Sequence, residues 1–323
     1  MKLAAFEAQG RPRWQRLSEL LDALEQGRGA ADGVAVAELP GLYRHVCNDL
    51  ALARERELST GLVAELNELA LRGHQLLYRA RADDWPRIAS FLTQVFPRAV
   101  RREWRLLLVC HVFFYSLTFG IGYLAWRNPD VIYSFIDEPQ VRVMEDMYDP
   151  VEGAATKARG PQEDAAMFGY YIWNNISIAF RTFAGGLAFG VGSLVSLVFN
   201  ALQLGLIAGH LVYKGSTVPF FTYVVAHSAF ELTAMLLSGV AGMRLGLAIV
   251  APGPRTRLVA LRSAAQQSLP IVTGCTLMLV IAASIEAFWS PRLLPPPLKY
   301  GAGATLWLLV AAWLGLAGRV SGD

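Results

Sequence analysis

Long apolar stretches dominate the chain from residue 104 onward and predict helices that cross a membrane. Six such stretches cover about 104–126, 172–190, 193–213, 220–250, 269–289 and 301–318. One crossing needs about 20 predominantly apolar residues. The run from 172 to 213 is about twice that length, and Gly190 and Gly192 allow a tight turn within it. The pattern therefore predicts an all-α, polytopic membrane domain over 104–319 with about six transmembrane helices.

Residues 1–103 follow a different pattern, in which apolar positions recur at helical spacing between charged ones. Leucines spaced three and four apart predict an amphipathic helix over 14–26. Further helices are expected over 42–58, over 59–82 and from Trp85 to Arg101, with a loop over 30–41. Such helices can bury one shared apolar core, so residues 1–103 are expected to form a small soluble helical bundle.

The uneven distribution of charge predicts the orientation of these helices. Only three of the 26 acidic residues lie beyond residue 171, and the basic segment 251–268 contains none of them. Basic loops favour the cytoplasmic side, whereas the segment 127–171, with nine acidic and four basic residues, is expected outside. Six crossings then place the head 1–103 and both termini in the cytoplasm. Five crossings, with 172–213 as one helix, would put the basic segment outside.

Composition excludes several other classes of protein. Apolar residues make up 54% of the 323 positions and charged residues 17%, which excludes a disordered chain and a single water-soluble domain. The net charge of +3 is too small to favour nucleic acid as a partner. Cys47, Cys110 and Cys275 lie far apart and form no metal-type spacing. His45 and His74 lack partner ligands at metal-type spacing and are expected at the surface of the head.

A few polar residues interrupt the predicted transmembrane helices, and such residues are costly unless they serve structure or function. The candidate polar cluster consists of Asn174, Asn175, Arg181, Asn200, His210, His227, Glu231 and Glu286. Under the six-helix topology, the histidines and glutamates of this set lie in the outer half of the membrane. His227 and Glu231 are four residues apart and therefore share one face of a helix.

Three interpretations of this polar cluster remain open. In the first, it is a buried structural network in which Arg181 pairs with Glu231 or Glu286, because an unpaired buried charge is costly. In the second, a buried glutamate beside a histidine exchanges protons or lines a translocation path. In the third, His210, His227, Glu231 and Glu286 bind a metal, although the second histidine of the zinc motif HExxH is missing. We expect no catalytic residue and no cofactor.

Glycines recur along the predicted helices and allow their backbones to approach closely. Gly205 and Gly209 form a GxxxG pair, and further glycines recur over 185–192 and 239–246. A stripe of this kind either packs against another helix of the same chain or forms the seam of a homodimer.

Five short segments of the membrane domain occur in a recognisable order. They are Asn-Asn at 174–175, Phe-Asn-Ala-Leu-Gln-Leu-Gly at 199–205, His-Ser-Ala-Phe-Glu-Leu at 227–232, Ala-Gly-Met-Arg-Leu-Gly at 241–246 and Ile-Glu-Ala-Phe-Trp-Ser-Pro at 285–291. Together they resemble the stage II sporulation protein M family of bacterial inner-membrane proteins over about 104–291. The head is similar to the N-terminal region of longer family members, through Leu-Asn-Glu-Leu at 66–69 and Arg-Gly-His-Gln-Leu-Leu-Tyr at 72–78.

The resemblance implies a polytopic protein that acts without catalysis of its own. The namesake in endospore-forming bacteria is thought to be a scaffold that holds two peptidoglycan-degrading proteins at the septum. Longer members with a cytoplasmic head are often encoded near MoxR-type ATPases and RDD-domain membrane proteins. This chain departs from the short namesake through its head, its last helix and Ser228, which replaces a glycine of the family motif.

Two functions are therefore expected from different classes. The first is a non-enzymatic scaffold or assembly protein, whose head and acidic external loop would bind envelope proteins, among them peptidoglycan enzymes, a MoxR-type ATPase or an RDD-domain protein. The second is a transporter, channel or lipid-handling protein that uses the polar cluster. A homo-oligomer, with a dimer favoured, fits either function. The sequence shows no recognisable pairing of a nucleophile with a general base, which disfavours an intramembrane hydrolase.

Overall fold

The computed structural model describes residues 3–25, 33–79, 84–153, 155, 157 and 159–319. Every regular element among these residues is a helix, so the predicted all-α class is confirmed. The chain divides into two compact units, residues 1–89 and residues 90–323, and each is described by itself.

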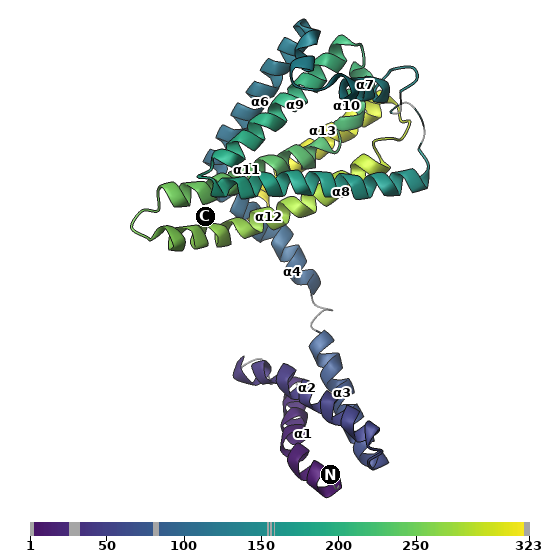
Figure 1. Cartoon of the computed structure of the whole chain (residues 1–323), viewed down its shortest axis with the longest axis vertical. Helices are drawn as coiled ribbons and strands as arrows, with labels where there is room; N and C mark the ends of the chain where they lie inside the picture. Colours follow the sequence, from purple (N-terminus) through teal and green to yellow (C-terminus); the bar gives the residue numbers. More distant parts are fainter. Residues whose placement is uncertain are drawn as a thin grey trace. The chain divides into compact units, whose positions relative to one another are not determined.

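The first unit is built from three helices (Figure 1). Their buried side chains form a core rich in leucine. They are α1 (Leu3–Glu25), α2 (Gly33–Glu55) and α3 (Thr60–Arg79). Leu17, Leu21 and Leu66 are completely buried, as the helical spacing of the leucines predicted. The predicted loop over 30–41 is helical from Gly33 onward, because burial of Leu39 in the core favours the helix despite Pro40.

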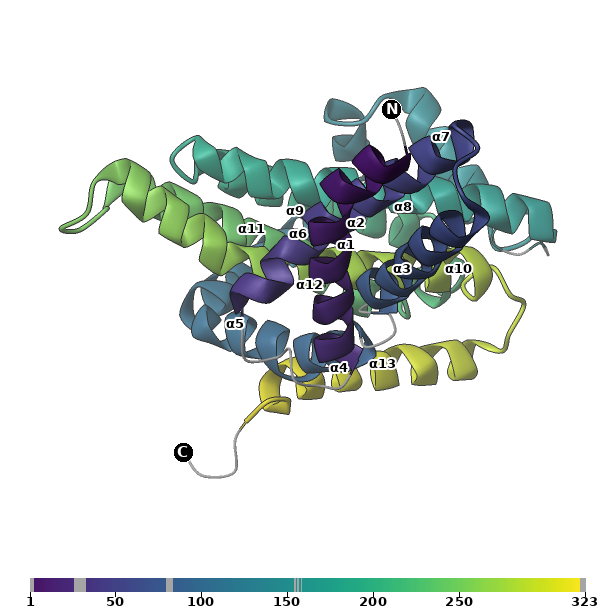
Figure 2. The same ribbon diagram turned by 90° about the horizontal axis from the view of Figure 1, so that it is seen from below.

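The helix α4 (Asp84–Ser90) falls almost wholly within residues 1–89. The second unit contains the helices that follow it and begins with a π-helix (Phe91–Val95) and α5 (Phe96–Arg102) (Figures 1 and 2). The long helices are α6 (Trp104–Arg127), α8 (Pro161–Ala184), α9 (Val191–Tyr213), α11 (Ser228–Val250), α12 (Arg257–Phe288) and α13 (Pro296–Leu316). Short helices between them are a 3-10 helix (Pro129–Ser134), α7 (Glu138–Met147) and α10 (Thr217–Val224). α6 pairs with α9, while α11 packs along both α12 and α8.

Four of the described helices are long and apolar enough to cross a membrane, namely α6, α9, α11 and α12. α8 and α13, at two of the six predicted crossings, fall outside this set. α8 carries Glu163 and Asp164 in its first turn and Arg181 in its last, and α13 contains Lys299 near its start. These charges lower the mean hydropathy of both helices, so their crossing stays a prediction.

The structure corrects several predicted helix boundaries. The predicted helix 220–250 is interrupted after Val224, so that α10 and α11 are separate helices. α8 and α12 begin well before 172 and 269, and the basic segment 251–268 is therefore largely helical. The acidic segment 127–171 contains the 3-10 helix and α7. Both helices begin with polar turns, which explains why they start earlier than predicted. Hydropathy identifies the apolar part of a helix and misses a polar first turn.

The division between the two units falls earlier than residue 103. Phe96 and Val100 of α5 are buried in the same core as α12 and α13, and a side chain at Gly274 of α12 would collide with the Phe96 ring. The indole N–H of Trp313 donates to the Leu92 carbonyl at 2.8 Å. The segment after residue 90 is therefore part of the membrane unit.

A glycine corner connects α8 to α9, at the turn that the sequence predicted. Gly190 has a φ of +84°, a left-handed conformation that L side chains rarely adopt. One turn earlier, Gly186 lies against the backbone of Gly242 on α11, without room for a Cβ atom. The corner therefore fixes the contact between three helices.

The GxxxG pair on α9 packs within the chain. A Cβ atom at Gly205 would lie 2.5 Å from the Thr118 carbonyl of α6, and one at Gly209 would collide with the Gly122 carbonyl. α6 therefore occupies this stripe, and a homodimer seam would have to use another surface.

Candidate functional site

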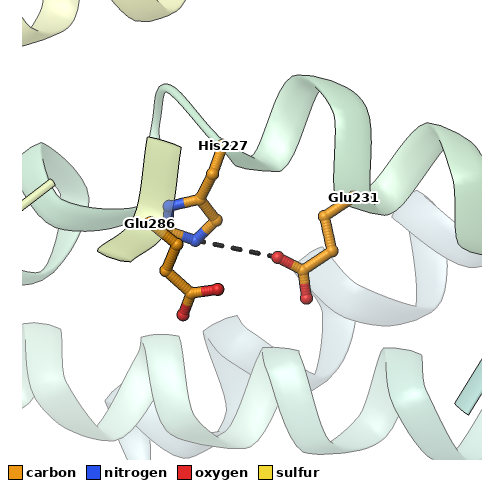
Figure 3. Close-up of side chains that lie close together, drawn as sticks. All are labelled: His227, Glu231 and Glu286. Carbon is orange, nitrogen blue, oxygen red and sulfur yellow. Dashed lines mark ion pairs between the residues drawn. The ribbon is translucent and has the colours of Figure 1, made fainter. Parts of the chain in front are cut away.

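Three side chains of the predicted polar cluster converge within the membrane unit (Figure 3). His227 lies in the break before α11, Glu231 lies one turn into α11, and Glu286 lies in the last turn of α12. The His227 Nε2 atom is 3.8 Å from the Glu231 Oε2 atom. One potential ligand atom from each of the three residues lies within 4.8 Å of the other two.

The break between α10 and α11 and the end of α12 together orient the imidazole. The Ser290 hydroxyl, just beyond α12, is 3.2 Å from the His227 Nδ1 atom. Lys299 of α13 donates from its Nζ atom to the Ser290 carbonyl at 2.7 Å, and both residues are buried. With Nδ1 engaged by Ser290, the Nε2 atom of His227 faces the two carboxylates.

Burial differs among the members of this cluster. The His227 side chain is 6% exposed, whereas that of Glu231 is 31% exposed and Glu286 is half-buried. One carboxylate oxygen of Glu286, Oε2, is fully buried and makes no hydrogen bond. Asn175 of α8 is buried and interacts with the Glu286 carboxylate, but its Nδ2 atom makes no hydrogen bond of good geometry. The arrangement therefore combines an accessible carboxylate with buried polar atoms that have no partner.

No lysine or arginine among the described residues forms an ion pair with either glutamate. Arg159 acts on Glu286 through its charge, but its guanidinium donates to the Tyr223 hydroxyl at 3.0 Å and approaches Glu163 to 3.7 Å. Tyr223 in turn shares a hydrogen bond of 3.0 Å with Tyr171. Sequence reasoning missed this contact of one arginine with two tyrosines, because Arg159 and Tyr171 lie in the acidic segment 127–171 and Tyr223 lies in an apolar run.

Two predicted members of the cluster lie elsewhere. Arg181 is exposed and donates to the Ser177 carbonyl at 3.1 Å, so the predicted pairing with a glutamate is wrong. His210 bonds Glu145 of α7 at 2.7 Å, which removes it from the proposed metal ligands. Both predictions failed because hydropathy gives the depth of a residue but not the side of the helix that it faces.

The asparagines of the cluster have local partners. Asn174 donates to the Asn175 side-chain oxygen at 3.0 Å, beside the site. Asn200 donates to the Ser196 carbonyl one turn earlier on α9 at 2.8 Å. Of the predicted asparagines, Asn175 is therefore the one that faces the carboxylates.

Glu145 forms a second polar contact, which ties α7 to the end of α9. Its carboxylate is bonded by His210 at 2.7 Å and paired with Lys214 at 3.1 Å. Burial raises the pKa of Glu145, but the hydrogen bonds from His210 and Lys214 outweigh burial, so the net pKa lies below its usual value.

The apolar helices and the polar residues between them define a polytopic α-helical membrane protein. The family model for Stage II sporulation protein M matches residues 109–291, which include all three residues of the converging cluster. The chain therefore belongs to the stage II sporulation protein M family, as its motifs suggested.

Other comparisons add no activity. A model described as a domain of unknown function matches residues 4–79, within the first unit. An uncharacterised protein of Methanocaldococcus jannaschii is 26% identical over 129 residues, which is 38% of this chain and 70% of that protein. No solved structure was found to match the chain.

Proposed function

We propose that this protein is a non-enzymatic scaffold or assembly protein of the bacterial inner membrane, linked to remodelling of the cell envelope. The observation that carries the proposal is the division of the chain into a family membrane domain and a separate helical head with its own core. A head that buries its leucines internally leaves its outer surface available to a partner.

The head offers such a surface. Its ion pairs lie outside the leucine core, among them Arg72 with Glu25 at 2.9 Å and Arg16 with Glu38 at 3.2 Å. Leu71 on α3 is 55% exposed, and Trp85 and Ile88 of α4 are further exposed apolar side chains of this unit. A single exposed apolar side chain is normal on a protein surface, so Leu71 serves here as the position at which contact with a partner is tested. We propose a MoxR-type ATPase as the partner of the head.

The membrane unit would bind different partners. Acidic residues of α7 and its neighbours lie on the segment 127–171, whose expected place is outside the membrane. Peptidoglycan enzymes would dock there, and an RDD-domain protein or a second copy of the chain would dock in the membrane. In this arrangement both termini are cytoplasmic, and the scaffold joins a cytoplasmic partner to an envelope enzyme.

Labelling tests the orientation. Val151→Cys, at a position that is 82% exposed, should react with an impermeant maleimide in intact cells. Arg255→Cys, in the turn between α11 and α12, should react only after the membrane is opened. Replacement of Cys47 by serine removes the one native cysteine that is not buried. The reverse labelling pattern would overturn the orientation.

Photo-crosslinking tests the scaffold itself. A photoreactive residue at Leu71 should give a stoichiometric adduct with one defined protein when the full chain is isolated from native membranes. The same residue at Glu19, an exposed position on α1, is the matched control. If Leu71 gives no protein adduct and the purified protein has no companion, the scaffold proposal fails.

Ion or solute transport is the second candidate, because the Glu231 carboxylate stays 31% exposed beside buried polar groups. Flux into proteoliposomes that depends on Glu231, and is absent in Glu231→Gln, would favour transport. If Glu231→Gln abolishes function in cells while the protein still inserts and binds its companion, a pure scaffold is untenable.

A further inference from the structure

We infer that His227, Glu231 and Glu286 form a binding site for one divalent transition-metal ion of the zinc class. The site joins the α10–α11 break to the end of α12. It goes beyond the scaffold proposal, because metal binding and partner binding can be measured separately.

The geometry of the three ligands carries the inference. Imidazole nitrogen and carboxylate oxygen are both ligand types that zinc binds, and His227, Glu231 and Glu286 supply one nitrogen and two carboxylates. These atoms lie within 4.8 Å of one another, and the His227–Glu231 pair is at 3.8 Å. Zinc bonds of ~2.0–2.2 Å place neighbouring tetrahedral ligands roughly 3.5 Å apart, so rotation of the glutamate side chains is enough to close the site.

The surroundings of the imidazole are those of a metal ligand. Histidine ligands are usually held through their second ring nitrogen, which fixes the tautomer and the direction of the coordinating nitrogen. In this protein the Ser290 hydroxyl engages Nδ1 at 3.2 Å, and Lys299 holds the Ser290 carbonyl at 2.7 Å. His227 is 6% exposed, and its Nε2 atom has no hydrogen-bond partner. The free ring nitrogen therefore points at the carboxylates.

The charge of the cluster also favours a cation. Two carboxylates lie side by side, and neither forms an ion pair with a lysine or arginine of the described chain. Tyr148, Tyr171, Tyr223 and Arg159 face the same region, and Arg159 is engaged by Tyr223 and Glu163. A divalent ion would balance both carboxylates, whose burial without compensation is costly.

Asn175 provides an independent observation. It is 6% exposed and interacts with the Glu286 carboxylate. Neither its Nδ2 atom nor the buried Oε2 atom of Glu286 has a hydrogen bond of good geometry. Zinc sites with three protein ligands keep a fourth position for water or another ligand. The partial exposure of Glu231 leaves access to that position, and the Asn175 side chain would hold the Glu286 oxygen that the ion does not bind.

The test uses the full chain, purified in detergent and stripped with a chelator. Titration with Zn²⁺ against a chromophoric chelator should show one site per chain. Glu286→Gln and His227→Asn should each weaken binding by at least about tenfold, since loss of a ligand should exceed the 10- to 100-fold effects of ligand-supporting residues. Co²⁺ should give the visible absorption of a four-coordinate ion in the wild type and lose it in both variants.

A matched control separates this site from other histidine–carboxylate contacts. His210→Asn breaks the His210–Glu145 bond of 2.7 Å and should leave Zn²⁺ affinity unchanged. Each variant is also tested for a single peak in size exclusion without metal, and Glu231→Gln replaces any variant that does not fold. The inference is overturned if the stripped protein binds no Zn²⁺, or if His210→Asn weakens binding as much as Glu286→Gln. If the two glutamates share a proton instead of binding a metal ion, the stripped protein should bind no Zn²⁺.

Discussion

The head and the membrane unit are both helical, yet their helices are held together by different means. In the head, large side chains fill the space between helices, and Trp14, Leu17 and Leu66 are completely or almost completely buried. In the membrane unit, glycines bring backbones into contact, as where Gly186 meets Gly242. Water drives leucines together in the head, whereas lipid offers no such force and close packing must replace it.

Polar groups show the same contrast. Most charged pairs of the head lie on its surface, where an ion pair contributes little because both groups give up contacts with water to form it. In the membrane unit, Glu103 is buried and is paired with the partly exposed Arg244 at 3.1 Å. One changed residue should therefore have a larger effect in the membrane unit.

Substitution of Gly242 should give the largest effect. In Gly242→Val the new side chain would collide with Ser193 and would lie 2.6 Å from the Phe183 carbonyl. Backbone atoms cannot yield as a side chain can, so we expect loss of more than about 3 kcal/mol, and failure to purify as a single species. Gly120→Val on α6, where nothing lies within 4 Å, is the control. Equal yields and melting temperatures for the two variants would contradict the glycine packing.

A cavity in the head should come next. Leu66→Ala removes a completely buried side chain and should cost about 2–5 kcal/mol of head stability. Because the head is a separate unit, denaturant should unfold the head of this variant while the membrane unit stays folded. The rate of proteolysis of each unit measures this. Leu71→Ala, at a side chain that is 55% exposed, should change stability by less than about 0.5 kcal/mol. A joint loss of both units would show that they fold together.

The bond between α7 and α9 should give a smaller effect that depends on pH. The pKa of Glu145 is lowered in the folded protein, so its contribution is present above the pKa of the unfolded chain and is lost as pH falls through the folded value. Glu145→Gln should cost roughly 1–2 kcal/mol at neutral pH and reduce the loss of stability that occurs as pH falls below the usual pKa of a carboxyl group. Asp146→Asn, one residue further along the chain, is the control, and this variant should lose stability at acid pH as the wild type does.

The smallest effect is expected at the surface of the head. Arg72 bonds both Asp22 and Glu25, yet both carboxylates are substantially exposed. Arg72→Gln should therefore cost less than about 1 kcal/mol, and the difference should disappear in 1 M salt. A larger cost that persists in salt would mean that Arg72 stabilises the head through packing of its side-chain stem instead.

The hydrophobic pattern predicted the all-α class and the leucine core of the head, and the length of the apolar run 172–213 together with its glycines predicted the turn near Gly190. These properties depend on local sequence, because the spacing of apolar residues along a helix and the glycines of a turn involve residues that are close together in the chain. The motifs also pointed to the family, and they included His227, Glu231 and Glu286. What the sequence could not predict was which polar residues share a site, since Arg181 and His210 lie at similar depth but face other partners.

The tertiary structure decided those partners. The break before Ser228 turns His227 toward α12, and the packing of α11 on α12 brings Glu286 to it from a distant part of the chain. Ser290 and Lys299 orient the imidazole through contacts that no spacing in the sequence reveals. The sequence by itself therefore determined the helices and their membrane character, whereas the rotation and packing of those helices determined the site.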